Sequence, residues 1–287
     1  MAFDNAFEAL ADASDDSRWA FGTGFEDPLS GVDTSVPSGM DGAALGAYCL
    51  MLGDDALIFS HRLQQWCTNA PELEDEVAIA NIGLDLLGQA RLLLARAGKA
   101  DGSGRDEDEL AFFRAEHEFR NVRLAELERG DFGQLIAVLL VFSTWRLALF
   151  QRLTGSADPV LRAIAAKGIK ELAYHRDYAA RWAVRLGDGT EYSHERMRAG
   201  LESVWPYVGE LFTPHEIERQ AGVLVPREEF DDVLAQVLSA ATLTTPEVPP
   251  RAGVAGRMGR DGVHTEALGP LLAELQSVAR ALPEATW

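Results

Sequence analysis

The chain has 287 residues, 47% of them hydrophobic, so it is long enough to bury a large core and has an ordinary globular composition. Its 45 acidic residues outnumber 26 basic ones, giving a formal net charge of −19. A surface this acidic repels nucleic acid and anionic lipid, so neither is an expected partner. No uninterrupted apolar run reaches the ~18 residues of a membrane span, and the N-terminus lacks a secretory pattern.

The two cysteines are Cys49 and Cys67, which we expect on one helix. Eighteen residues of helix span about 27 Å, which is too far for a disulfide. Two cysteines are also too few to hold an iron–sulfur cluster. Free thiols in a cytoplasmic protein are therefore predicted.

Residues 1–40 differ from the rest of the chain. They contain eight acidic residues and one basic residue, Arg18, and much of the remainder is Gly, Ser, Pro or Thr. This composition predicts an acidic, weakly ordered N-terminal arm. Its aromatic residues would allow docking on a partner, and a plain disordered extension is the alternative. Residues 41–287 are expected to form a single helical domain.

From residue 41 onward, apolar residues recur at three- and four-residue steps, which indicates helices. Asp41 is placed to cap the first helix, and Pro71 and Pro159 to begin later ones. The four long predicted helices cover 42–69, 71–98, 132–153 and 159–186. Shorter helices are predicted over 106–129, 192–211, 214–221, 227–243 and 266–281.

The connections predict how the long helices are arranged. The first two are joined by a tight turn, and so are the last two. A connection over about 100–131, with a helix of its own, separates these pairs. Two hairpins joined by one long crossover are typical of ferritin-like four-helix bundles. We therefore predict an all-α, ferritin-like bundle with extra C-terminal helices.

Ferritin-like di-iron enzymes take one Glu from each of two helices and a Glu-x-x-His pair from each of the other two. Residues three apart can face one interior point, which is why the spacing matters. The first predicted helix offers Asp54 or Asp55. The second offers Asp85, but the residue three positions later is Gly88, which has no side chain.

The fourth long helix carries Glu171, with Tyr174 where the motif requires His and His175 one step further. A hydrogen-bonded pair of Glu171 and His175 within the helix is the favoured interpretation. A ligand role for His175 is the alternative.

The third long helix decides the prediction. Residues 132–153 contain no Asp and no Glu, and the polar residues available are Gln134, Ser143, Thr144 and Arg146. Neutral hydroxyls cannot balance two iron ions in a low-dielectric core. We therefore predict a degenerate site, with no catalytic, cofactor-binding or metal-binding residue in this chain.

Other polar residues are expected around this centre. We predict a buried hydrogen-bonded network of Asp54, Asp85, Tyr174 and His175, with Arg62 or Arg91 as a further member. A substitute metal site is conceivable on the crossover, although a solvated face is favoured there; its residues are Glu116, His117 and Glu118. Four histidines are isolated and are not expected to be ligands; they are His61, His194, His215 and His264. No phosphate-binding glycine motif is present, so nicotinamide or flavin chemistry would belong to another chain.

A set of sequence runs resembles a known family. The runs are Leu52–Ile58 (LGDDALI), Arg62–Cys67 (RLQQWC), Ala70–Glu74 (APELE), Ala80–Arg91 (ANIGLDLLGQAR), Ala166–His175 (AKGIKELAYH) and Gly262–Pro270 (GVHTEALGP). Together they resemble the C subunits of ring-1,2-phenylacetyl-CoA epoxidase, also called phenylacetyl-CoA oxygenase. The resemblance covers about 45–287 in one order, and the arm 1–40 falls outside it.

The resemblance implies a ferritin-like, structural subunit without a functional metal site. It implies a homologous catalytic A subunit that holds a di-iron centre, a small B subunit, and a reductase with FAD, NADPH and an iron–sulfur cluster. Such a complex epoxidises the ring of phenylacetyl-CoA during aerobic phenylacetate breakdown. This sequence has Ser143 where some relatives carry an acid, which makes metal binding less expected still.

Two other functions remain open at this point. One is a ferritin-like oxidase or oxygenase with a reduced ligand set, which would have at most three carboxylates and one imidazole of the six ligands required. The other is a stand-alone acidic binding protein, which would leave the pattern of long helices without a use.

Overall fold

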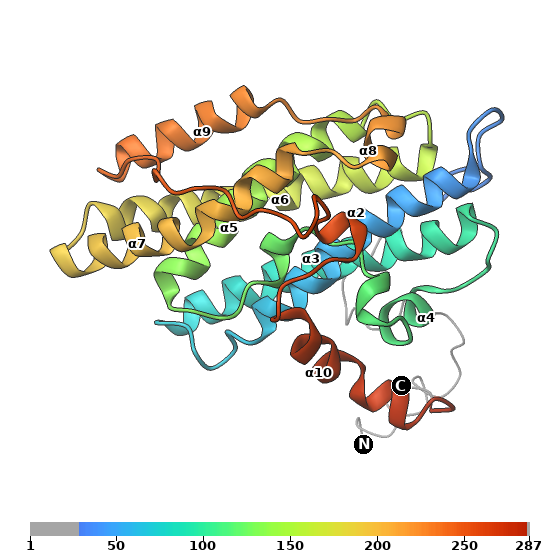
Figure 1. The fold of residues 1–287 in the computed structure, drawn as a ribbon, viewed down its shortest axis with the longest axis horizontal. Helices are drawn as coiled ribbons and strands as arrows, with labels where there is room; N and C mark the ends of the chain where they lie inside the picture. Colours follow the sequence, from blue (N-terminus) through green and yellow to red (C-terminus); the bar gives the residue numbers. More distant parts are fainter. Residues whose placement is uncertain (1–28, 286–287) are drawn as a thin grey trace, which may run out of the picture.

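A computed structural model describes residues 29–285 of the chain (Figure 1). This part contains nine α-helices and several 3₁₀ turns. Within the same residues there is no β-strand, only an isolated bridge between Val254 and Arg257. The all-α class predicted from the sequence is confirmed for the described part of the chain.

Four long helices form the body of the molecule: α2 (Gly42–Gln64), α3 (Leu73–Ala100), α5 (Phe132–Leu153) and α6 (Pro159–Gly187). α2 packs along α3 and α5 along α6, each pair joined by a short turn, and α3 also contacts α6 (Figure 1). The two predicted hairpins are therefore present, and one long connection joins them. The ferritin-like class itself stays a prediction.

The helix starts follow the predicted capping chemistry in two of three cases. Asp41 accepts a hydrogen bond from the amide of Ala43 at 2.9 Å and caps α2. Asp158 caps α6, whose first residue is Pro159. The third case was wrong, because α3 begins two residues after Pro71.

The turn after α2 begins earlier than predicted. α2 ends at Gln64 rather than at residue 69, and Thr68 has a positive φ of 68° that no α-helix accommodates. Cys67 therefore lies in an exposed turn, whereas Cys49 is buried inside α2. The predicted placement of both cysteines on one helix was wrong, although both are free thiols.

The helix predicted over 106–129 was also wrong. Only α4 (Glu107–Phe112) is helical there, followed by the 3₁₀ turns η2 (Glu116–Glu118) and η3 (Arg123–Glu126). The backbone amides of Arg120 and Val122 donate to the carboxylates of Asp54 and Asp55, each at 2.8 Å. An amide that binds a side chain is no longer available for the helical bond to the carbonyl four residues earlier. The crossover is thus held against α2 instead of coiling.

The C-terminal third adds the predicted extra helices, as α7 (Glu191–Val204) with η4 (Trp205–Phe212), α8 (Glu216–Ala221), α9 (Arg227–Ala240) and α10 (Leu268–Ala281). The 3₁₀ turn η5 (Gly259–Asp261), which precedes α10, was not predicted. α7 packs on α5, where Gly133 and Gly200 meet; a Cβ on Gly200 would lie 2.7 Å from the Gly133 backbone. α8 packs on α2, and α10 contacts α4 (Figure 1).

Three described helices, α2, α3 and α5, are long and apolar enough to cross a membrane by length and composition. The search of the sequence for uninterrupted apolar runs did not detect them. Their most apolar windows are 72%, 50% and 89% buried inside the protein, respectively. Packing in the bundle accounts for the apolar composition of α2 and α5. Half of the window in α3 is not buried, and Leu84 and Leu87 are exposed at the surface.

Only the last part of the predicted N-terminal arm is described. Residues 29–40 contact the bundle through Val32, Val36 and Met40. The guanidinium of Arg96 donates to the Thr34 carbonyl at 2.6 Å and fixes this segment against α3. Residues 1–28, with most of the acidic and aromatic side chains of the arm, lie outside the described residues.

Candidate functional site

The interior of the four long helices contains a buried arginine. Arg146 on α5 is 0% exposed. Its Nε donates to the Gln89 Oε1 at 3.1 Å, and its Nη2 donates to the Leu52 carbonyl at 3.2 Å. Its Nη1 lies 4.0 Å from the Asp55 carboxylate. Burial lowers the pKa of Arg146 to about 10, against the opposing effect of Asp55, so the guanidinium remains protonated at neutral pH.

Gln89 connects this cation to the fourth helix. The Gln89 Nε2 donates to the Glu171 Oε2 at 3.0 Å, so the amide uses its oxygen towards Arg146 and its nitrogen towards the carboxylate. Asp55, Gln89, Arg146 and Glu171 come from α2, α3, α5 and α6, one residue from each. We call these four residues the arginine network. It places a permanent positive charge among the helices that a di-iron protein would use for ligands.

The two adjacent carboxylates of α2 are each paired with a distant arginine. Asp54 accepts from Arg114 Nη1 at 2.9 Å and is contacted by the second Nη of the same guanidinium. Asp55 accepts from Arg260 at 2.9 and 2.8 Å. Such two-pronged pairs are strong and directional. Both carboxylates are fully buried, so both are committed to holding the crossover and the η5 segment.

The predicted ligand positions on α3 and α6 form separate contacts. His175 Nε2 lies 3.0 Å from the Asp85 carboxylate, and Glu171 is bound by Gln89 instead. The predicted pair of Glu171 with His175 was therefore wrong, because the neighbouring helix supplies a partner for each. Tyr174 points outward and is 52% exposed.

The predicted central network is confirmed for one contact, between Asp85 and His175, and wrong for its other members. Asp54 pairs with Arg114 of the crossover, and Asp85 pairs with His175. Tyr174 is exposed and hydrogen-bonds to none of the predicted members. Arg62 donates to the carbonyls of Glu126 and Ala267 instead. Arg91 pairs with Glu107. The side chains that meet at the junction of the four long helices are instead those of the arginine network.

Gly88 and Ser143 supply no charge to the interior. A Cβ built on Gly88 would meet no atom within 4 Å, so this position is open rather than blocked by packing. The Ser143 hydroxyl donates to the Leu139 carbonyl at 2.6 Å and is used within its own helix. Neither position compensates for the missing acids of α5.

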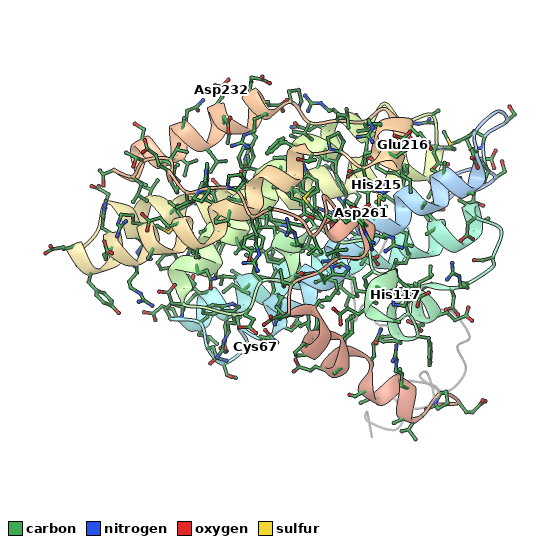
Figure 2. All side chains as sticks on the ribbon, in the orientation of Figure 1. Cys67, His117, His215, Glu216, Asp232 and Asp261 are labelled. Atoms are coloured by element: carbon green, nitrogen blue, oxygen red, sulfur yellow. The ribbon has the colours of Figure 1, made fainter. Side chains whose placement is uncertain are left out.

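The crossover residues proposed as substitute ligands, Glu116, His117 and Glu118, are exposed on η2. His117 lies outside the four-helix body (Figure 2). Among residues 29–285 no group of three or more His, Cys, Asp or Glu is arranged to hold a metal ion.

Known proteins resemble this chain over most of its length. Residues 33–287 match the family described as "Phenylacetic acid catabolic protein" (PaaA_PaaC). The chain belongs to this family. One relative is the C subunit of the 1,2-phenylacetyl-CoA epoxidase of Escherichia coli (strain K12), which is 44% identical over 251 residues, 85% of this chain and 99% of the relative. The resemblance to epoxidase C subunits seen in the sequence is confirmed.

The remaining histidines do not cluster. His194 Nδ1 lies 2.7 Å from the Gly187 carbonyl, and His215 lies 3.5 Å from Asp261 near the surface (Figure 2). His61 is 3.9 Å from Glu274. His264 is different, because it pairs with the fully buried Glu126 at 2.9 Å. No spacing in the sequence links these two residues.

The pair of His264 and Glu126 predicts a pH dependence of stability. Burial favours the neutral imidazole, but the hydrogen bond and charge of Glu126 outweigh it, so the pKa of His264 is raised. The folded-state pKa then lies above the unfolded value of about 6.5. The imidazolium therefore stabilises the fold below pH ~6.5, and this contribution is lost as the pH rises through the folded pKa.

We expect His264→Gln to lower the free energy of unfolding by about 1–3 kcal/mol at acidic pH, since it removes a charged hydrogen bond to the buried Glu126 carboxylate. The loss should be smaller at alkaline pH. Urea unfolding at about pH 5.5 and about pH 8.5 measures the difference. His117→Gln, at an exposed position, is the control. An equal loss for His264→Gln at both pH values would contradict the assignment.

Proposed function

We propose that this chain is the non-catalytic, structural C subunit of a phenylacetyl-CoA 1,2-epoxidase complex acting in phenylacetate catabolism. The observation that carries the proposal is the buried guanidinium of Arg146 at the junction of α2, α3, α5 and α6. A ferritin-like di-iron enzyme needs unpaired carboxylates there. Here the nearby carboxylates of Asp55 and Glu171 already have partners, and the guanidinium repels divalent cations.

The family resemblance supports the remaining composition of the complex. We propose that a homologous A subunit holds the di-iron centre, and that a small B subunit and a reductase with FAD, NADPH and an iron–sulfur cluster complete it. The chain is proposed to act in the cytoplasm, with a ferritin-like bundle and no metal of its own. Its role is to stabilise the catalytic subunit by packing against it.

An apolar stripe on α3 supports such packing. Leu73, Val77, Leu84 and Leu87 are exposed, and at 3.6 residues per turn they fall within about 80° of arc. Tyr174 on α6 is exposed next to His175, which bonds Asp85 of α3. Fully buried cores of stable subunit interfaces are apolar and rich in aromatic side chains. We propose that this α3–α6 face, defined by these five residues, contacts the catalytic subunit.

Co-expression tests the proposal. The chain is produced together with the catalytic A subunit, the complex is isolated by size exclusion, and the chains are then separated for iron analysis. We expect a stable hetero-oligomer in which iron stays with the A subunit. About two irons per copy of the present chain would instead favour an oxidase or oxygenase with a reduced ligand set. A chain that remains monomeric beside the A subunit would contradict the structural role.

A further inference from the structure

The residues before the described part of the chain carry a sequence pattern of their own. Residues 1–28 include seven acidic residues and one basic residue. Phe3, Phe7 and Leu10 are spaced at i, i+4 and i+7, so they would share one face of a helix. The acidic residues of the same stretch would lie on the other side of that helix; they are Asp4, Glu8 and Asp12. This stretch, which we call the arm segment (residues 3–12), has the pattern of a peptide that lays an apolar face on an apolar surface.

The described chain begins at one end of the helix pair α3 and α6. Arg96, near the end of α3, donates to the Thr34 carbonyl at 2.6 Å and pairs with Asp158, which caps α6. Leu29 packs against the core a few residues before this contact. The arm segment is therefore tethered where α3 ends and α6 begins.

The α3–α6 face lies within reach of this tether. The 18 residues between Leu10 and Leu29 span at most about 60 Å when fully extended. Leu84 lies 12 residues before Arg96 on α3, which is about 18 Å along the helix. A tethered segment has an effective concentration on the order of 1 mM, so a contact with a dissociation constant of about 100 µM would be about 90% occupied.

α6 is a basic element in a chain whose formal net charge is −19. It has two acidic residues and six basic ones, which are Arg162, Lys167, Lys170, Arg176, Arg181 and Arg185. Lys170 is exposed and lies four residues before Tyr174, so it borders the α3–α6 face. The first turn of α3, where Leu73 lies, is acidic. Charge therefore favours the half of the face around Leu84 and Leu87 as the site for an acidic segment.

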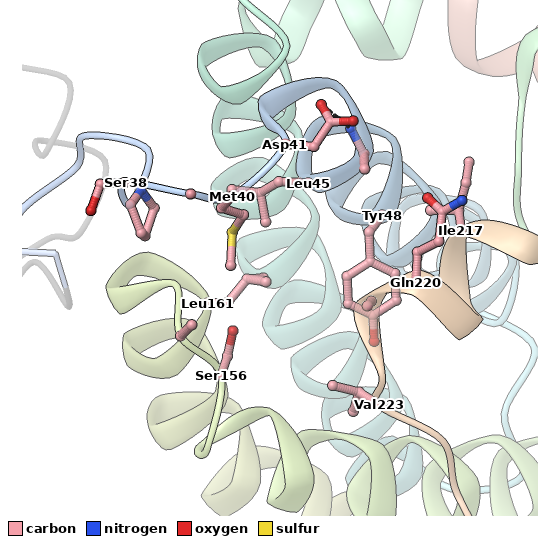
Figure 3. Close-up of a pocket in the computed structure, with 15 residues that line it drawn as sticks. Ser38, Met40, Asp41, Leu45, Tyr48, Ser156, Leu161, Ile217, Gln220 and Val223 are labelled. Carbon is pink, nitrogen blue, oxygen red and sulfur yellow. Dashed lines mark hydrogen bonds between the residues drawn. The ribbon is translucent and has the colours of Figure 1, made fainter.

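Two hollows elsewhere on residues 29–285 suit an acidic segment less well. One, of about 420 Å³, lies at the start of α2 (Figure 3), and Asp41 is its one charged lining residue. The other, of about 220 Å³, lies beside Trp145, and Glu218 is its one charged lining residue. Neither hollow offers a cation, so both would repel the acidic side chains of the arm segment.

We propose that the arm segment docks on the α3–α6 face of its own chain, around Leu84, Leu87 and Tyr174, with its acidic side towards Lys170. The docked segment shields the apolar stripe from water in the unassembled chain. This contact is independent of the proposed function. Its consequence for assembly rests on the proposed function, because a catalytic subunit that binds the same face must displace the segment.

The test uses the full chain with a nitroxide spin label in the arm segment. The label is attached to the thiol introduced by Ala9→Cys, in a chain that also carries Cys67→Ser, since Cys49 is buried and does not react. With ¹³C-labelled leucine methyl groups, we expect the signals of Leu84 and Leu87 to be strongly broadened. Leu224, exposed outside this face, is the internal reference and should stay sharp. The broadening should persist on about tenfold dilution, because the contact is intramolecular.

Variants separate a specific contact from random approach of the arm. Phe7→Ser should abolish the broadening, whereas Phe25→Ser, outside the arm segment, is the matched control and should retain it. Lys170→Glu should lower the ratio of docked to free segment about fivefold, and Arg257→Glu, at an exposed position off this face, should not change it. The family match begins at residue 33, so the arm variants should keep the helical circular dichroism.

Binding of the A subunit is measured separately on the same variants. Phe7→Ser should tighten it about tenfold, because no docked segment has to be displaced. Broadening at Leu84 together with an unchanged affinity would support the docking of the arm segment and contradict the proposed partner face.

Two results would overturn the docking proposal. One is a set of Leu84 and Leu87 signals as sharp as that of Leu224. The other is broadening that appears only when a spin-labelled chain is mixed with a separate ¹³C-labelled chain, because the occupant would then be the arm of a second copy.

Discussion

Asp55→Asn is expected to lower the free energy of unfolding by about 3–5 kcal/mol. The Asp55 carboxylate is fully buried, accepts two hydrogen bonds from Arg260, and lies 4.0 Å from Arg146. A neutral amide would remove the ion-pair partner of the buried Arg146 and would leave Arg260 with Glu218 alone as its counter-charge. Because domains are stable by only about 5–15 kcal/mol, the urea midpoint should fall sharply. Urea unfolding followed by circular dichroism at neutral pH measures the change.

The control for this experiment is Asp177→Asn. Asp177 pairs with Arg181 one helical turn away on α6, but its side chain is 53% exposed. Exposed pairs contribute about 0–1 kcal/mol, so this variant should unfold close to the unmodified protein. Similar midpoints for the two variants would show that the burial of Asp55 does not have the energetic role assigned to it.

Leu84→Asp is expected to weaken assembly with the catalytic subunit on the order of 100-fold. Leu84 is 46% exposed and lies in the middle of the α3–α6 face. A carboxylate there would be buried without a partner when the interface forms, which is unfavourable by several kcal/mol. Binding is measured by titrating the labelled variant with the A subunit. Thermal unfolding of the isolated chain should be nearly unchanged, since the side chain is already half in solvent.

Leu224→Asp is the matched control, because Leu224 is 45% exposed and lies after α8, outside the α3–α6 face. We expect it to bind the A subunit like the unmodified chain. If Leu84→Asp binds equally well, the catalytic partner docks on another surface. If both variants lose binding, the loss reflects general acidification rather than a specific face.

The parts of the fold that the sequence predicted are those decided by local chemistry. Periodic apolar residues located the long helices, and the side chain of Asp41 or Asp158 marked where a helix begins. The helix predicted over the crossover was wrong because two backbone amides there bind side chains of α2. The amides of Arg120 and Val122 donate to Asp54 and Asp55, which lie 66 and 67 residues earlier in the chain. No local pattern between residues 106 and 129 signals that a distant carboxylate competes with helical hydrogen bonding.

For the candidate site, the sequence likewise showed which residue types each helix carries but not which distant residues they contact. The lack of acids on α5 was visible in the sequence, and so was Arg146, a charge in a long apolar run that must find partners in a core. Its partners were not visible. Arg260 meets Asp55 across 205 residues, and Gln89 meets Arg146 across 57. Within α6, spacing suggested that Glu171 and His175 bind each other, but contacts with α3 override that local preference.

The adjacency of Asp54 and Asp55 links two remote stretches of chain to one point. One carboxylate secures the crossover, and its immediate neighbour secures the stretch around Arg260. If either stretch detaches, the buried carboxylate of Asp54 or Asp55 loses its arginine partner. The neighbouring carboxylate, one residue away, still holds the other stretch. We therefore expect the chain beyond residue 250 to unfold together with the crossover and the four long helices. Its release should also accelerate hydrogen exchange at the Val122 amide, which shares the Asp55 oxygen used by Arg260.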